Sequence, residues 1–152
     1  MTLTLFRATS LLLLLPTLVW GAIGEVTDHS GSGAIERDDG FEILEVEDEL
    51  GVESMDVVVT EKGKVRIDFI DETRVDITEH SRLVIDDFVY DPASGQGSLS
   101  LKAGLGTIRY ASGKIAKNSR QRVKITTPSA VVGVRGTDFA MNSVRLDKNL
   151  SL

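Results

Sequence analysis

The chain of 152 residues contains no cysteine. Disulfide bonds, a thiolate nucleophile and cysteine-ligated zinc or iron–sulfur sites are therefore excluded. The absence does not decide the cellular compartment, because many exported proteins also lack cysteine.

Helical periodicity is also missing, since no stretch keeps it for more than about two turns. Instead, apolar and polar residues alternate, most clearly over residues 64–69. Inward-facing runs begin at Val65, Val75 and Leu83, a spacing typical of a meandering sheet, a sandwich or a β-roll. We therefore predict an all-β fold of short antiparallel strands, arranged as a β-roll, a solenoid-like coil or a sandwich, with no substantial helix after the N-terminal segment.

Turn-forming residues divide these runs. The sequence predicts turns at residues 61–63, 71–72 and 79–80, a loop at 91–97, two short strands within 24–40, and a loop or at most one helical turn at 113–121. Residues 142–152 contain only scattered apolar residues, which predicts either a short last strand or a truncated C-terminus.

Long apolar runs are scarce as well. The run at residues 11–20 is about half of the roughly 20 residues that a bilayer span needs, and it contains Pro16. Arg7 precedes it, and small residues follow at Gly21 and Ala22, which is typical of a secretory signal peptide. We predict a signal peptide over 1–21 and a β-domain over 22–152 that is periplasmic or secreted and has no stable membrane anchor.

Charge is unevenly distributed. Residues 25–56 contain one cation, Arg37, and twelve acids: Glu25, Asp28, Glu36, Asp38, Asp39, Glu42, Glu45, Glu47, Asp48, Glu49, Glu53 and Asp56. The stretch 102–135 contains no acid and eight cations: Lys102, Arg109, Lys114, Lys117, Arg120, Arg122, Lys124 and Arg135. Three interpretations are open. The two segments pack together and partly neutralise each other, or each segment is a solvated face, or the basic segment binds an anionic partner. Nucleic acid is disfavoured, because the chain is acidic overall and lacks interleaved aromatic residues.

The most specific pattern lies at residues 127–139. A proline opens a β-branched run, and glycine stands on both sides of a single cation. We expect Arg135 to lie beside an apolar layer, paired with Asp138 or with a carboxylate of the 71–72 turn, since a buried guanidinium needs such a partner. Gly136 fits a backbone position with positive φ, and the hydroxyl of Thr137 fits the closing of a turn.

This pattern resembles the signature of the FecR domain family. The structural signature residues are Thr127, Pro128, Ala130, Val134, Arg135, Gly136, Thr137 and Phe139. Looser similarities extend through residues 65–71, 74–77, 81–86 and 97–104. The resemblance implies a relation to inner-membrane regulators that sense a loaded iron transporter and control a sigma factor. Because a signal peptide replaces the cytoplasmic segment and the spanning helix, that relay cannot operate within this chain, which is similar instead to stand-alone exported members.

Other candidate sites are weaker. The carboxylates of Asp68, Asp71, Glu72 and Asp76 are calcium-type oxygen ligands, but no calcium loop is present. His29 and His80 each lack a second histidine at metal-ligand spacing. No catalytic, metal or cofactor site is predicted.

We therefore expect a non-catalytic exported binding module whose partner is an envelope protein or a cell-wall glycan. The alternative is an extracytoplasmic signalling component related to iron-transporter sensing, which acts in trans with a membrane partner. The oligomeric state stays open.

Overall fold

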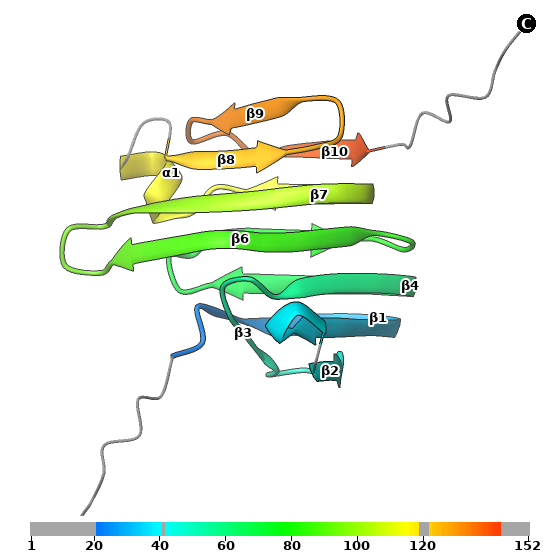
Figure 1. Ribbon diagram of the computed structural model, residues 1–152. Helices are drawn as coiled ribbons and strands as arrows, with labels where there is room; N and C mark the ends of the chain where they lie inside the picture. Colours follow the sequence, from blue (N-terminus) through cyan, green and yellow to red (C-terminus); the bar gives the residue numbers. More distant parts are fainter. Residues whose placement is uncertain (1–20, 41, 119–121, 144–152) are drawn as a thin grey trace, which may run out of the picture.

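The computed structural model describes residues 21–40, 42–118 and 122–143 (Figure 1). The elements are β1 (Gly24–Arg37), the 3-10 turn η1 (Asp38–Gly40), β2 (Glu42–Glu45), β3 (Gly51–Val52), β4 (Val57–Phe69), β5 (Arg74–Ile77), β6 (Arg82–Asp91), β7 (Gln96–Ala111), α1 (Lys114–Asn118), β8 (Val123–Thr126), β9 (Val131–Val134) and β10 (Phe139–Ser143). The predicted all-β class is confirmed.

All ten strands belong to one sheet that folds over into two layers (Figure 1). The C-terminal half of β4 pairs with β5, while its N-terminal end pairs with β6. β7 divides in the same way, because its first part pairs with β6 and its last part pairs with β5 and β10. The long strands therefore pass from one layer to the other, which is closer to a β-roll than to a sandwich of two separate sheets.

Not all strands are short, which corrects the sequence prediction. β1 has 14 residues, β4 has 13 and β7 has 16. The turn expected at residues 61–63 is instead a bend within β4, and the two strands expected within 24–40 are one continuous β1. At this bend Gly31 faces Gly63, and a Cβ on either glycine would lie 1.7 Å from a backbone oxygen of the other strand. The glycines therefore permit a corner that the sequence pattern presents as a turn.

The core lies between the layers. Alternation correctly predicted its inward side chains, since Val65, Ile67, Val75, Ile77 and Leu83 are all buried. The rings of Phe69 and Phe88 stack across the core with centroids 5.5 Å apart.

One complete coil links the layers near the C-terminal end. The chain leaves β7, passes through the five-residue α1 and returns as β8, which pairs in parallel with β7. The buried carboxylate of Asp71 accepts hydrogen bonds from the backbone N–H of Thr73 at 3.0 Å and from that of Ile115 at 3.2 Å. It thereby ties the β4–β5 turn to α1. The sequence predicted a loop or at most one helical turn over 113–121, and the described part of that stretch, which excludes 119–121, contains this short helix.

Two predictions fall partly or wholly on residues outside this description. The signal peptide prediction falls almost entirely on residues 1–20, and the prediction for the C-terminal tail falls on 144–152 apart from Asn142 and Ser143. Within the described part of the chain, no helix has the length and apolar character needed to cross a membrane.

Candidate binding groove beside the signature

The first half of the signature forms the β8–β9 hairpin turn. Thr127 closes it, because its N–H donates to the carbonyl of Ala130 at 2.8 Å and its Oγ1 accepts from the Ala130 N–H at 2.9 Å. Pro128 lies inside this turn, where its fixed φ is favourable, rather than at the start of a strand. The Thr-Pro-x-Ala pattern therefore encodes a hairpin.

The second half carries the chain from β9 to β10, in the other layer. Gly136 has a φ of 63°, and the Thr137 hydroxyl donates to the carbonyl of Arg135 at 3.4 Å, so both predicted roles are confirmed. The anchor of this crossing is Ser112. Its N–H donates to Oδ1 of Asp138 at 2.7 Å, and its hydroxyl donates to the carbonyl of Thr137 at 3.0 Å.

The expected burial and pairing of Arg135 is wrong. Its side chain is exposed, and it forms no ion pair with any described residue. Asp138 bonds to Ser112 instead, and Asp71 bonds to backbone N–H groups. The prediction assumed that the apolar run before Arg135 is a buried layer. In the structure only Val134 of β9 is buried, and Val131 is exposed.

The arginine that does pair with a buried carboxylate is Arg37. Its Nε and Nη2 donate to the two carboxylate oxygens of Asp56 at 2.9 and 2.8 Å, and Asp56 is 1% exposed. Nη2 also donates to the carbonyl of Gly51 at 3.0 Å, and Nη1 lies 3.1 Å from Glu53. This contact joins β1, β3 and the start of β4. The signal that identifies it in the sequence is that Arg37 is the single cation among twelve acids.

Beside the crossing lies an open groove of about 350 Å³, which we call the β5–β7–β10 groove. Its lining consists of Arg74, Asp76, Arg109, Tyr110, Ala111, Asp138, Phe139 and Ala140. Arg109 is exposed and forms no ion pair within the described part of the chain. It lies opposite Ala140, whose side chain is too short to fill the neighbouring space. The Phe139 ring stacks on Tyr110 at 5.4 Å and is half-buried.

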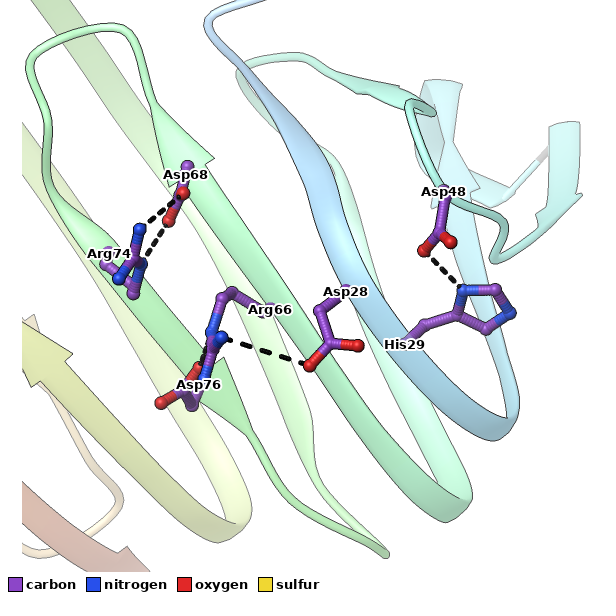
Figure 2. A network of polar contacts seen from close by, with 7 residues as sticks. All are labelled: Asp28, His29, Asp48, Arg66, Asp68, Arg74 and Asp76. Carbon is purple, nitrogen blue, oxygen red and sulfur yellow. Dashed lines mark hydrogen bonds and ion pairs between the residues drawn. The ribbon is translucent and has the colours of Figure 1, made fainter.

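A ladder of alternating charges leads to this groove across the same face (Figure 2). Arg66 donates to Asp76 at 2.6 Å and lies 3.9 Å from Asp28, while Arg74 donates to both carboxylate oxygens of Asp68. The Arg74 guanidinium holds the pKa of Asp68 below its ordinary value. Arg109 is the next cation in this order, facing Asp76 across β5 and β7. Asp76 is already bonded to Arg66, which leaves Arg109 available to a partner.

A second depression, of about 260 Å³, lies in the other layer beside Thr127 and Pro128. Its two cations are both engaged, because Arg82 pairs with Glu36 at 2.9 Å and Lys102 pairs with Asp86. This depression therefore offers less to a charged partner than the β5–β7–β10 groove.

The four carboxylates considered as calcium ligands do not converge. Asp68 and Asp76 bond to arginines, Asp71 points into the core, and Glu72 pairs with Lys114 at 2.6 Å. Of the histidines, His29 bonds to Asp48 at 2.8 Å (Figure 2), and His80 is exposed in its turn.

The acidic and basic segments do not neutralise each other directly. Ion pairs from the acidic segment reach Arg66 and Arg82, but among the described residues none reaches a cation of 102–135. The acidic β1–β3 and the basic β8–β9 instead form opposite ends of the stack (Figure 1). Of the alternatives drawn from the sequence, direct packing of the two segments against each other is not supported for the described residues, and the other two stay predictions.

These features define an all-β domain folded into two layers, with a signature-bordered groove on one face. The chain belongs to the FecR family, because the model of that family, described as FecR protein, matches residues 55–151. The match confirms the resemblance and starts after β1–β3. Searches of curated proteins and of solved structures returned no match to the chain. Membership associates the chain with a family of the cell envelope and of extracytoplasmic signalling related to iron transport.

Proposed function

We propose that this chain is a non-catalytic binding module of the cell envelope, which holds an extended segment of another envelope protein in the β5–β7–β10 groove. The observation that carries this proposal is Arg109, an exposed guanidinium without an ion pair among the described residues, at the rim of a groove bordered by the signature. A carboxylate on the partner would complete the alternating charge ladder.

The composition of the groove supports a protein partner over a cell-wall glycan. Ala111, Ala140 and the half-buried Phe139 contribute apolar surface to its lining, and Arg74, Arg109 and Asp138 contribute charge, a combination that is usual in protein interfaces. A glycan site would favour an exposed aromatic platform, whereas the Phe139 ring is stacked on Tyr110.

The charges support a role without catalysis. A carboxylic acid that donates a proton near neutral pH needs a raised pKa. Arginine contact has the opposite effect here, because Arg74 lowers the pKa of Asp68. The carboxylates of the ladder serve the positioning of arginine side chains.

The predicted signal peptide at residues 1–21 supports export to the periplasm or beyond. A second candidate function is a signalling component that acts in trans with a membrane partner in iron-transporter sensing. The family match over residues 55–151 favours this candidate. Both functions use the same groove and differ in the identity of the bound protein.

The test is site-specific photo-crosslinking from position 140, in the groove, in cells that express the full chain. We expect one envelope protein to be captured, and we expect Arg109→Glu to abolish the capture. Arg122→Glu is the matched control, because it reverses the charge of another exposed arginine that lies outside the groove. Capture of a membrane regulator or an iron transporter would select the signalling candidate. Capture of glycan alone, or equal capture by the two variants, would contradict the proposal.

A further inference from the structure

One row of side chains crosses the outer face of a layer from end to end. The strand registers of the sheet connect its members in the order Ile43, Glu36, Val57, Val84, Lys102, Thr126 and Val131. We call it the outer row. Its two ends, Ile43 and Val131, are 69% and 61% exposed, and no other large hydrophobic residue in the described part of the chain is more exposed.

Both ends of the outer row lie on edge strands. β2 and β9 are the first and last strands of the sheet order, and they lie at opposite ends of the stack (Figure 1). Within the described residues, each has a strand on one side only. An edge strand presents unpaired backbone N–H and C=O groups, and a β-branched apolar side chain on it favours the addition of another strand.

The two edges carry opposite charge. Near β9, Arg122, Lys124 and Arg135 are exposed and form no ion pair with a described residue. In and next to β2, Asp38, Glu42, Glu45 and Glu47 are exposed. Because one end of the stack is basic and the other is acidic, each end is complementary in charge to the opposite end of a second copy of the same chain.

Strand direction permits this contact. Following the pairings from β2 to β9, which are antiparallel except for β7–β8, gives β9 the direction opposite to β2. If two copies stack in the same orientation, β9 of one therefore meets β2 of the next as an antiparallel pair. The outer row would then continue from Val131 of one copy to Ile43 of the next.

We propose that copies of this chain associate head to tail, with the β9 edge of one copy pairing with the β2 edge of another. The contact is heterologous and leaves a free edge at each end, so that association is open-ended and grows with protein concentration. It uses the two ends of the stack and leaves the β5–β7–β10 groove open to its partner.

The test is analytical ultracentrifugation of protein purified after expression of the full chain, over a wide range of concentrations at low and high salt. We expect the weight-average mass of the wild type to rise with concentration and to fall with added salt. Val131→Glu and Ile43→Lys should each lose self-association, because each variant places on one edge a charge that repels the edge it would meet. Val89→Glu is the control, since Val89 is 57% exposed but lies on β6, away from both edges.

The decisive measurement is the mixture of the two blocked variants. Each retains the edge that the other has lost, so an equimolar mixture should form one-to-one dimers and nothing larger. A wild type that stays monomeric at every concentration would overturn the proposal. Blocked variants that still self-associate, or a mixture that stays monomeric, would also overturn it, because such results point to a symmetric contact or to none.

Discussion

The N-terminal end of the stack and the signature end each contain one prominent arginine, and the two arginines have opposite fates. Arg37 is held by both oxygens of a buried carboxylate, whereas Arg135 is exposed. The sequence around Arg135 is the more apolar of the two. A guanidinium is therefore buried where a carboxylate and carbonyls converge on it, and apolar neighbours in the sequence do not ensure that convergence.

Arg37→Ala tests this difference with the largest expected effect. It leaves Asp56 buried and without its cation, so the free energy of unfolding should fall by about 3–5 kcal/mol. Arg135→Ala is the matched control and should change stability by less than about 0.5 kcal/mol, since its side chain is exposed. Denaturant unfolding of both variants gives the comparison. Equal effects would show that the two arginines have similar surroundings in solution.

The variant Asp71→Asn tests whether a buried carboxylate that has no cation partner contributes as much to stability as Asp56 does. Asp71 is 0% exposed, and its oxygens accept from the Thr73 N–H, the Thr73 hydroxyl and the Ile115 N–H. The amide of the variant turns its NH₂ group toward one of these donors, which leaves that donor without an acceptor. We therefore expect the free energy of unfolding to fall by about 3 kcal/mol. Denaturant unfolding measures the loss, and hydrogen exchange at Ile115 should accelerate. A variant as stable as the wild type would mean that α1 does not depend on this carboxylate.

Tyr110→Phe should act in the opposite direction. The Tyr110 hydroxyl is buried and has no hydrogen-bond partner among the described residues, while burial raises the pKa of this phenol. Removing it keeps the ring that stacks on Phe139, so thermal unfolding should show a gain of up to about 1 kcal/mol. A loss of stability would show that the hydroxyl is hydrogen bonded in solution.

Acidification should give the smallest effect on stability, through the charge ladder on β1, β4 and β5. The hydrogen bond from Arg74 lowers the pKa of Asp68 below its ordinary value of 3.8. The stabilisation is therefore complete above that value and is lost as the pH falls through the lowered pKa. Because the Arg74–Asp68 pair is largely solvated, we expect it to contribute less than about 1 kcal/mol to the free energy of unfolding.

Asp68→Asn provides the comparison for this pH effect. It should be slightly less stable than the wild type at neutral pH, and the difference should disappear as unfolding is followed from about pH 5 to about pH 2. A difference that is independent of pH would exclude the ion pair as its source.

Alternation and turn residues determined the all-β class and the inward side chains, and they limited residues 113–121 to a loop or at most one helical turn. These features depend on the two-residue period of a strand and on residue types that a few neighbours can specify. The signature likewise identified the family and the roles of Gly136 and Thr137, because a tight turn is a local structure.

Tertiary structure alone decided the rest. Whether residues 61–63 turn or bend depends on Gly31, which is distant in the sequence, and the lock of Arg37 needs a carboxylate from the start of β4. The groove exists because β5, β7 and β10 come together, and the outer row exists because seven strands align in register. Contacts between distant segments are set by the register of the whole sheet, which no short stretch of sequence contains.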